Sequence, residues 1–347
     1  MTQNRDWSRI VIRPDVAIED ALRVINAGAL RIAVVVDAEG RLVGTLTDGD
    51  VRRSIIAHVP LSESVAKAMN VRPQVAVATA PRDSILRLMR EQNFSAVPVV
   101  DDGGRLIDVV TLHDPLQQVS NNNPVLLMAG GFGTRLRPLT DDRPKPMLKI
   151  GNKPILETTL DSLINAGFRR FFISVHYLAD TIKTHFGTGE RWGVDISYVE
   201  ENEPLGTAGA LSLLPGTFDQ PILMLNGDVV TSVDFRALLD FHVENNPAAT
   251  MCVREYNVQV PYGVVQATGH RVDAVVEKPI QRFFVNAGIY VLSADVIARV
   301  PKGRRIDMPE LMTGLIAEKR NVTMFPIHED WIDVGRMEDF NRAIGQP

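Results

Sequence analysis

The sequence has a single cysteine, Cys252, among its 347 residues. One thiol cannot form an intramolecular disulfide, so the fold must depend on its apolar core. No apolar run approaches the about 20 residues that a membrane-spanning helix needs. The opening residues, Met-Thr-Gln-Asn-Arg-Asp-Trp, lack the apolar core of a signal peptide. These absences predict a cytoplasmic protein without a membrane partner.

An excess of positive charge is also lacking, because the formal net charge is −5. This balance argues against a nucleic-acid partner, and any phosphorylated substrate must be bound by local cations. The composition, 45% hydrophobic and 23% charged, is that of an ordinary globular protein. The length exceeds what one hydrophobic core usually organises, which predicts two domains.

An internal repeat occupies the first third of the chain. A constant offset of 64 residues relates residue 37 to 101, 47 to 111 and 50 to 114. Each copy predicts a helix (residues 18–27 and 84–92), a strand, a glycine turn, a second strand and a Thr-x-x-Asp helix entry. Two such copies should pack as a pseudo-twofold pair.

This repeat resembles a tandem CBS module, to which we assign residues 1–120. The resemblance implies adenine-nucleotide binding (AMP or ATP), since threonine hydroxyls and helix N-termini suit phosphate and aspartates accept hydrogen bonds from ribose. The ligand candidates are Thr47, Asp50, Thr111 and Asp114. Asp108 replaces the Gly44 of the first copy, which weakens the second cleft. Alternatively, these residues only cap helices in a module used for dimerisation.

Residues 121–124 follow as a polar, proline-ended linker, and residues 125–347 form the second predicted domain. Strand-like runs at 125–128, 171–175, 196–199, 222–225, 250–253 and 287–292 alternate with helical segments. This alternation predicts an α/β fold with a Rossmann-like, mainly parallel mixed sheet.

The run from Met128 to Pro146 is the most informative motif. It reads Met-Ala-Gly-Gly-Phe-Gly-Thr-Arg-Leu-Arg-Pro-Leu-Thr-Asp-Asp-Arg-Pro-Lys-Pro and directly follows a predicted strand. Glycines let backbone N–H groups approach phosphate oxygens, and Arg135 and Lys145 can neutralise a triphosphate. The spacing matches neither the dinucleotide fingerprint nor the P-loop.

With its Lys-Pro ending, this run resembles the signature of the sugar-1-phosphate nucleotidyltransferases. The resemblance implies an enzyme that converts an NTP and a sugar 1-phosphate into an NDP-sugar and pyrophosphate. It implies nucleotide binding by Ala129, Gly130, Gly131, Gly133, Thr134, Glu201, Gly206 and Thr207, and catalytic roles for Arg135, Lys145, Asp228 and Lys278. The rival reading is a catalytically silent subunit that senses nucleotide sugars.

Two carboxylates are implied as ligands of Mg²⁺ by the same resemblance. Asp228 ends an apolar run, and Asp333 lies in Trp-Ile-Asp-Val-Gly. A divalent cation bridging phosphate oxygens would cancel the repulsion between two polyanions. Either residue alone could equally be a loop carboxylate.

The sugar and the base are specified by other segments. The resemblance assigns sugar binding to Tyr262, Gly263, Glu277, Asn286 and Gly288, and the sugar phosphate to Lys278. By the same resemblance, Glu201 stands where uridylyl and thymidylyl enzymes tend to carry glutamine. A carboxylate can accept hydrogen bonds from the N1 and N2 donors of guanine, which favours GTP as the nucleotide. The alternative is an acidic surface loop, because Glu200 and Glu203 flank it.

The CBS pair together with Glu201 is similar to the glucosamine-1-phosphate guanylyltransferases of nonulosonate (legionaminic acid) pathways. Uridylyl, thymidylyl and mannose-1-phosphate guanylyl transfer remain alternatives. We expect a homo-oligomer, at least a dimer.

Overall fold

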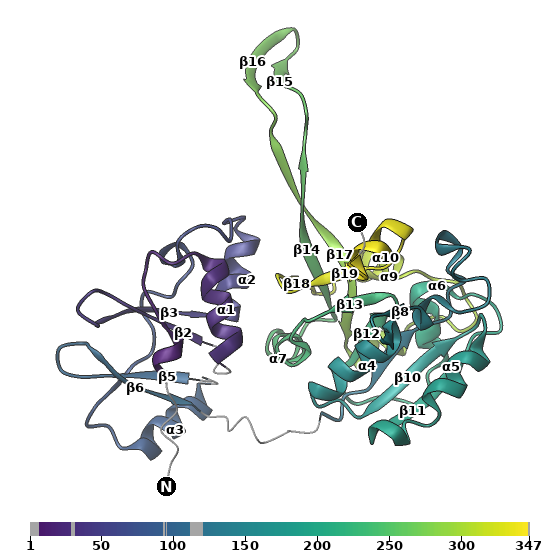
Figure 1. Ribbon diagram of the computed structural model, residues 1–347, viewed down its shortest axis with the longest axis horizontal. Coiled ribbons are helices and arrows are strands. Elements are labelled where there is room, and N and C mark those ends of the chain that lie inside the picture. Colours follow the sequence, from purple (N-terminus) through teal and green to yellow (C-terminus); the bar gives the residue numbers. More distant parts are fainter. Residues whose placement is uncertain (1–6, 29–31, 93, 95, 112–120, 346–347) are drawn as a thin grey trace. The chain divides into compact units, whose positions relative to one another are not determined.

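The computed structural model describes residues 7–28, 32–92, 94, 96–111 and 121–345. The chain separates into two compact units, Met1–Gln118 and Val119–Pro347, each considered by itself below (Figure 1). Among the residues described, no helix is both long enough and apolar enough to span a bilayer.

The first unit contains the same arrangement twice. One half comprises η1 (Trp7–Ile10), β1 (Val11–Ile12), α1 (Ile18–Gly28), β2 (Ile32–Val36), β3 (Leu42–Thr47) and α2 (Asp48–Ile56). The other comprises η2 (Val65–Lys67), β4 (Ala76–Val77), α3 (Arg82–Glu91), β5 (Ala96–Val100) and β6 (Leu106–Thr111). In each half the middle strand is parallel to the first strand and antiparallel to the third. The predicted repeat is therefore confirmed.

Reciprocal backbone hydrogen bonds join the two halves. Leu42 N donates to Gly104 O at 2.9 Å, and Leu106 N donates to Gly40 O at 3.1 Å. These four positions are related by the 64-residue offset, so each half makes the same bond to the other. The pair is pseudo-twofold, as the repeat predicts.

A seven-stranded sheet forms the centre of the second unit. Its order is β11 (Asp195–Glu200), β10 (Arg170–Val175), β7 (Val125–Met128), β12 (Ile222–Asn226), β17 (Ile280–Leu292), β14 (Ala249–Gln259) and β18 (Val322–Ile327). Four of the six pairings are parallel and two, β12–β17 and β14–β17, are antiparallel. The α/β fold with a mainly parallel mixed sheet is as predicted.

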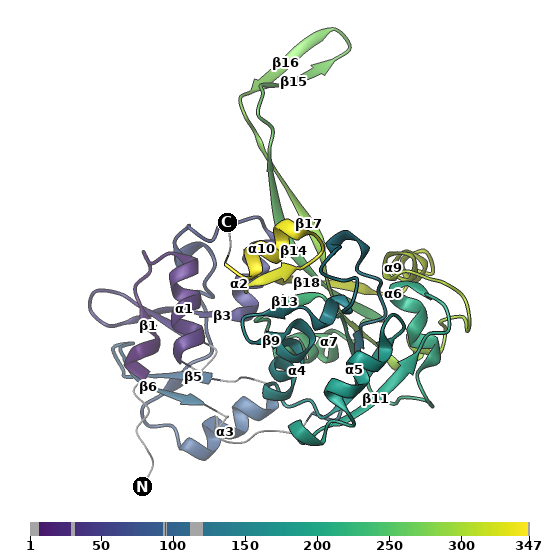
Figure 2. The ribbon, with the colours of Figure 1, turned by 45° about the vertical axis from the view of Figure 1, so that its right-hand side comes forward.

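Helices cover both faces of this sheet (Figures 1 and 2). Successive strand residues alternate between two apolar clusters: Leu127 and Leu225 pack on one side, Leu126 and Met224 on the other. The first side is covered by α4 (Ile155–Asn165), α5 (Ala179–Phe186) and α7 (Phe235–Asn245), the second by α6 (Gly206–Gly209), η6 (Ala210–Leu213), α8 (Ala294–Ile297) and α9 (Met308–Ala317). The core thus lies above and below the central strands.

Two strands run far beyond the sheet, which the sequence did not predict. The outer halves of β14 and β17 pair as a ribbon that continues into β15 (Val264–Thr268) and β16 (Arg271–Val276). Figures 1 and 2 show this ribbon projecting away from the sheet. Strands were expected only at 250–253 and 287–292, because only those parts read as buried apolar runs.

Short elements complete the second unit: η3 (Thr134–Leu136), η4 (Lys145–Met147), β8 (Lys149–Ile150), β9 (Lys153–Pro154), η5 (Glu190–Trp192), β13 (Val229–Thr231), β19 (Trp331–Asp333) and α10 (Met337–Ala343). Two residues of the predicted linker bond to this unit. Asn121 N donates to Gly167 O at 2.8 Å, and Asn123 Nδ2 donates to Pro221 O at 2.8 Å. The boundaries 1–120, 121–124 and 125–347 stay predictions.

Candidate active site

The candidate site lies where the parallel strands β7, β10, β11 and β12 end. The glycine loop follows β7, His176 follows β10, Glu201 follows β11, and Asp228 follows β12. Ala129 N donates to Ser174 O at 2.9 Å, which ties the loop to β10. Ligands of open α/β sheets bind at such carboxyl ends.

At two glycines of this site, a residue with a side chain would clash with neighbouring atoms. Gly133 has φ of 63°, and a Cβ there would lie 2.9 Å from Thr140 Cγ2. A Cβ at Gly227 would lie 2.3 Å from Met128 O. By contrast, a Cβ at Gly131 would meet nothing within 4 Å. The loop is therefore packed at Gly133 and open at Gly131, where a ligand could approach the backbone.

The buried cation of the motif is paired with the first predicted metal ligand. Lys145 is only 9% exposed, and its Nζ donates to Asp228 Oδ2. The other oxygen, Asp228 Oδ1, is buried and has no hydrogen-bond partner in the described part of the chain. A buried carboxylate oxygen without a partner costs free energy, so it points to a missing ligand.

The second carboxylate lies beside the first. Asp333 pairs with Val229 across β13 and β19, and Val334 N donates to Asp228 O at 3.0 Å. Burial, and then the negative charge of Asp228, raise the pKa of Asp333, while Lys145 and the exposed Arg135 oppose them. Residues more than a hundred positions apart thus meet at one place.

These residues fit a divalent cation. Two carboxylates that repel one another, one with an unpartnered oxygen, form the hard oxygen donor set that Mg²⁺ prefers. The lysine offsets only one of the two negative charges, which leaves room for further positive charge.

Glu201 is buried against the glycine loop. It is 7% exposed, its Oε1 accepts from Ser174 Oγ, and its Oε2 accepts from Leu205 N at 2.9 Å. A Cβ at Gly130 would lie 3.0 Å from Glu201 Oε1. The alternative of an acidic surface loop is therefore wrong for this residue. Each oxygen keeps a lone pair for a ligand donor.

The other residues predicted to bind the nucleotide differ in their exposure and in their contacts. Thr134 is exposed at the start of η3, and Gly206 begins α6 with φ of 78°. Thr207 Oγ1 accepts from Met308 N at 2.8 Å, and Thr207 N donates to Asp307 Oδ1 at 2.9 Å. The side chain of Thr207 therefore joins α6 to the start of α9.

The predicted sugar residues are divided between two places. Asn286 and Gly288 lie at the sheet: Asn286 Oδ1 accepts from Gly288 N at 2.9 Å, and a Cβ at Gly288 would lie 2.7 Å from Asn226 Nδ2. The remaining four, Tyr262, Gly263, Glu277 and Lys278, belong to the segments that join β14 to β15 and β16 to β17, out on the projecting ribbon.

Sequence reasoning missed two residues of this site. Asn226 ends β12, and its Oδ1 is the second buried, unpartnered polar side-chain atom of the described chain. Its place two residues before Asp228, after an apolar run, was a usable signal. Ser174 is fully buried in β10 and had no such signal, because only the folded chain brings it to Glu201.

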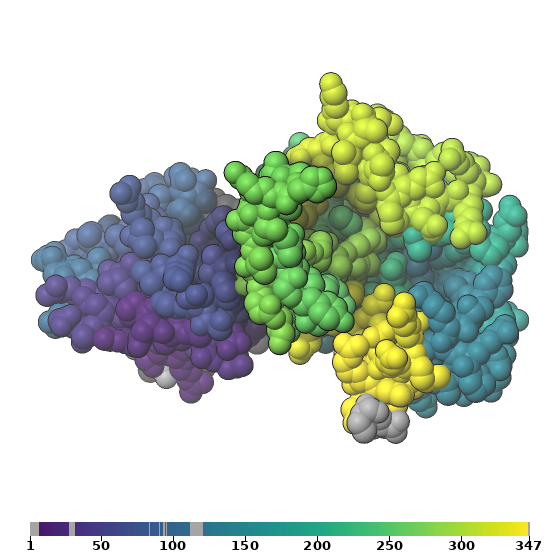
Figure 3. Space-filling view, turned by 90° about the horizontal axis from the view of Figure 1, so that it is seen from above, coloured from purple at the N-terminus to yellow at the C-terminus, as the bar shows by residue number. Residues whose placement is uncertain are grey.

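A view onto the second unit from the side of the ribbon shows a hollow (Figure 3). In this view the hollow lies beside the green ribbon, between the yellow-green segment near residue 310 and the yellow C-terminal segment.

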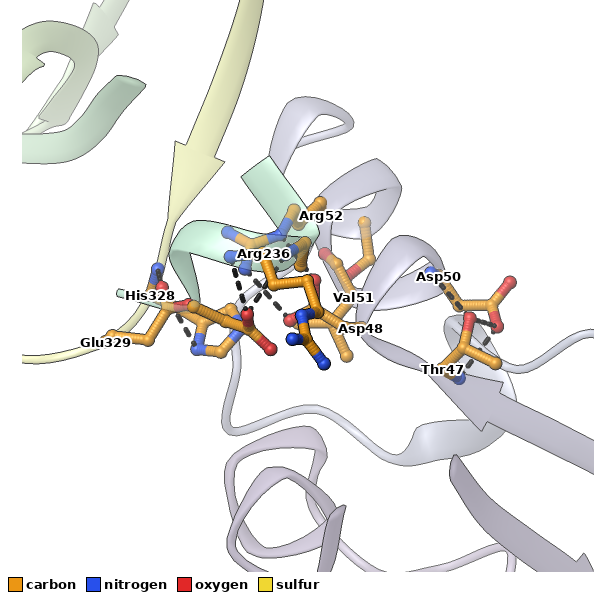
Figure 4. Close-up of polar contacts among 11 residues, drawn as sticks. Thr47, Asp48, Asp50, Val51, Arg52, Arg236, His328 and Glu329 are labelled. Carbon is orange, nitrogen blue, oxygen red and sulfur yellow. Dashed lines mark hydrogen bonds and ion pairs between the residues drawn. The ribbon is translucent and has the colours of Figure 1, made fainter. Parts of the chain in front are cut away.

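In the first unit, Thr47 and Asp50 form a reciprocal N-cap of α2 (Figure 4). Asp50 Oδ2 accepts from Thr47 N at 2.8 Å and from Thr47 Oγ1 at 2.6 Å, and Asp50 N donates to Thr47 Oγ1 at 3.3 Å. Thr111 ends β6, and Asp114 lies outside the described residues. The observed hydrogen bonds of Thr47 and Asp50 are therefore those expected from the alternative in which these residues cap a helix.

The two halves differ at the expected position. Gly44 and Asp108 occupy matching places opposite Val35 and Val99. A Cβ at Gly44 would lie 2.8 Å from Met69 Sδ, whereas Asp108 Oδ1 accepts from Val109 N at 2.7 Å. The halves are therefore symmetric in backbone but not in side chains.

Comparison with known families places both units. The family model for "Nucleotidyl transferase" matches residues 124–346, and the CBS domain model matches residues 7–57 and 63–121. The chain belongs to the nucleotidyl transferase family, with a CBS pair before the transferase domain. The resemblances to a CBS module and to the sugar-1-phosphate nucleotidyltransferases are thereby confirmed.

Among curated relatives, a mannose-1-phosphate guanyltransferase of Yarrowia lipolytica is 35% identical over 227 residues, which is 62% of this chain and 61% of the relative. One of Saccharomyces cerevisiae is 33% identical over 228 residues, 62% of each chain. The chain thus spans less than two thirds of the length of these relatives.

Among solved structures, HddC from Yersinia pseudotuberculosis, complexed with GMP-PN, is 27% identical. The match covers 64% of this chain and 98% of that one, with a TM-score of 0.50.

Proposed function

We propose that the protein transfers a nucleotidyl group from an NTP to a sugar 1-phosphate and releases pyrophosphate. The observation that carries this proposal is the buried, unpartnered Asp228 Oδ1, next to Lys145 and Asp333 at the strand ends that bear the glycine loop. Membership of the nucleotidyl transferase family supports the reaction class.

The reaction needs positioning and charge more than a protein nucleophile. An oxygen of the sugar phosphate attacks the α-phosphorus of the NTP; the new P–O bond forms as the bond to the bridging oxygen breaks, and pyrophosphate leaves. The glycine loop would bind the triphosphate through its amides, and Arg135 and Lys145 would offset its charge. Asp228 and Asp333 would hold Mg²⁺, which when bound supplies charge neutralisation to the phosphates.

In this proposal the preferred substrates are GTP and mannose 1-phosphate. Glu201 sits beside the glycine loop with free lone pairs for guanine N1 and N2 donors. The curated relatives reported above are named for mannose 1-phosphate, so this sugar replaces glucosamine 1-phosphate as the first choice. Adenine nucleotides at the CBS pair and a homo-oligomer remain part of the proposal.

A substrate screen tests the proposal. Pyrophosphate release is measured for four NTPs, each with mannose, glucosamine and glucose 1-phosphates, with and without Mg²⁺. We expect GTP with mannose 1-phosphate to give the highest kcat/KM. Turnover with UTP or dTTP alone would overturn the base assignment. Binding of nucleotide sugar without any turnover would favour the silent sensing subunit.

The substitution Asp228→Asn tests the metal ligand. Because an amide is a weaker cation ligand than a carboxylate, we expect turnover to fall by about 100-fold or more. Folding should survive, since the amide oxygen can still accept from Lys145 and the repulsion of Asp333 is removed. Circular dichroism and thermal melting check the fold. The exposed Asp219→Asn is the matched control and should keep full activity; an active Asp228→Asn enzyme would rule out the metal role.

A further inference from the structure

The backbone that follows Glu201 is held by a distant part of the chain. It leads into α6, which lies beside the start of α9 (Figure 2). We call residues 306–308, at the start of α9, the anchor segment. Ile306 N donates to Leu205 O at 2.9 Å, and Ile306 O accepts from Ala208 N at 2.9 Å. Residues a hundred positions downstream therefore fix the turn between Glu201 and α6.

The two helices exchange their capping side chains. Leu205, the N-cap residue of α6, has no polar side chain, and the carboxylate of Asp307 takes its place by accepting from Thr207 N at 2.9 Å. In return, Thr207 Oγ1 accepts from Met308 N at 2.8 Å, in the first turn of α9. Asp307 is itself the N-cap residue of α9, but within the described chain its carboxylate makes no capping bond to that helix. An aspartate at an N-cap normally caps its own helix, whereas here it is directed to α6.

The fit between the anchor segment and α6 leaves no room for a side chain at Gly206. This residue has φ of 78°, and a Cβ there would lie 2.6 Å from Ile306 O and 2.7 Å from Asp307 Oδ1. The anchor segment therefore lies directly against the turn that follows Leu205. Because close-packed atoms cannot move independently, a change at Asp307 is transmitted to that turn.

Leu205 connects this contact to the candidate base site. Its N–H donates to Glu201 Oε2 at 2.9 Å, and its carbonyl accepts from Ile306 N. The other carboxylate oxygen, Oε1, is held from β10 by Ser174 Oγ. Two separate donors thus fix the plane of the carboxylate, and one of them depends on where Leu205 lies. Guanine N1 and N2 are donors at a fixed spacing, so both oxygens must be in place to accept from them.

We propose that Asp307 is a positioning residue for base recognition, which acts through Leu205 on the Glu201 carboxylate. By fixing the turn at Gly206 and Thr207, it keeps Oε2 where a donor of guanine meets it. The inference rests on the proposed function, in which Glu201 reads the base. Loss of this support weakens the discrimination between bases but leaves the chemical step, at the phosphate end of the nucleotide, unchanged.

The substitution Asp307→Ser tests the proposal with a residue that lets α9 fold. Serine is a favoured N-cap residue and can cap α9, but its hydroxyl is one bond too short to reach Thr207 N. We expect KM for GTP to rise, and the ratio of kcat/KM for GTP to that for UTP to fall about 10-fold, as when one of two hydrogen bonds to a charged group is misplaced. The kcat at saturating GTP and the KM for the sugar 1-phosphate should stay within about twofold of the wild type.

Two further variants serve as controls. Asp307→Asn keeps an oxygen at the place of Oδ1 and should restore most of the wild-type ratio. Glu310→Ser changes an exposed carboxylate in the first turn of α9, which pairs with Arg304 at 3.0 Å, and should leave the ratio and both KM values unchanged. A merely structural role of Asp307 would instead lower the active fraction with every nucleotide alike, so that kcat falls and the ratio does not.

A double-mutant cycle tests whether Asp307 acts through Glu201. In the Glu201→Gln background the oriented carboxylate is already lost, so Asp307→Ser should change the ratio by less than about twofold. Multiplication of the two single effects would show that Asp307 acts elsewhere and would overturn the proposal. An unchanged ratio in the Asp307→Ser chain with Glu201 intact would overturn it as well.

Calorimetry without sugar 1-phosphate gives a readout that needs no turnover. The Kd values of GTP and UTP are measured with Mg²⁺, and their ratio should shift about 10-fold in Asp307→Ser. If the wild type releases no pyrophosphate with any substrate, the proposed function fails, and the Kd values alone decide the role of Asp307. If the wild type turns over GTP and Asp307→Ser keeps the wild-type ratio in both measurements, the proposed function stands and the positioning role is overturned. Equal binding of GTP and UTP by the wild type would also overturn it.

Discussion

Glu201 shows how burial changes the meaning of a single residue. Its neighbours Glu200 and Glu203 are exposed, whereas the Glu201 carboxylate is buried and receives one hydroxyl and one backbone donor. A buried charge is tolerated only when it is hydrogen-bonded in this way. In the proposed function, the position next to Gly130 would let this carboxylate accept hydrogen bonds from a base bound over the loop.

The substitution Glu201→Gln is expected to change base preference. An amide has only one acceptor oxygen, so the pair of guanine donors loses one acceptor, and Nε2 would face either Ser174 or the N–H of Leu205. We expect the ratio of kcat/KM for GTP to that for UTP to fall about 10- to 100-fold, equivalent to about 1–3 kcal/mol. Initial rates with both nucleotides provide the measurement. Glu203→Gln is the control, and an unchanged ratio would show that the base is read elsewhere.

At the scale of elements, a buried histidine joins one helix to two strands. His242 of α7 is 2% exposed; its Nδ1 lies 2.8 Å from Thr250 Oγ1 of β14, which in turn lies 3.0 Å from Thr323 Oγ1 of β18. Burial lowers the pKa of His242 to about 4. The neutral imidazole therefore belongs to the folded state.

The stability of the protein should consequently depend on pH through His242. The folded-state pKa, about 4, lies below the ordinary value of 6.5, so the folded state disfavours the proton that the unfolded state accepts. The contribution of the neutral His242 to the free energy of unfolding is fully present above about pH 6.5 and is lost as pH falls toward 4. The total loss is about 3 kcal/mol, at about 1.4 kcal/mol per pKa unit.

Chemical denaturation at several pH values between 7 and 4 checks this expectation. His242→Gln should be less stable at pH 7 but should lose less stability on acidification than the wild type. His270→Gln, at an exposed position in the turn between β15 and β16, is the control and should follow the wild type. Parallel curves for the wild type and His242→Gln would contradict the assignment.

The prediction of elements succeeded where a strand is buried and failed where it is not. The run Val125–Met128 was placed without error, and β10, β11 and β12 to within one residue at each end. The outer halves of β14 and β17 were missed, because exposed strand residues follow no apolar alternation toward a core. Pairing with each other, rather than burial, makes them strands.

At the scale of the whole molecule, a CBS pair and a nucleotidyl transferase domain share one chain, and the two halves of the pair differ at the matching positions of Gly44 and Asp108. We expect calorimetry with AMP or ATP to find one nucleotide bound per chain, because Asp108 places a carboxylate where the first half has Gly44. Thr47→Ala should abolish this binding and destabilise α2 by about 1 kcal/mol through loss of the N-cap. Thr47→Ser, which keeps the hydroxyl, is the control. Absence of any binding would leave assembly as the role of the pair.

The sequence by itself determined the family of the second domain, the repeat and the buried strands. These follow from local properties: glycines and cations at fixed spacing, a 64-residue offset, and apolar runs between turns. The tertiary structure alone decided that Asp333 lies beside Asp228, that Glu201 is buried against Gly130, and that the predicted sugar residues are divided between the sheet and the projecting ribbon. Burial, and the meeting of residues a hundred positions apart, depend on how the whole chain packs, and no local pattern encodes that packing.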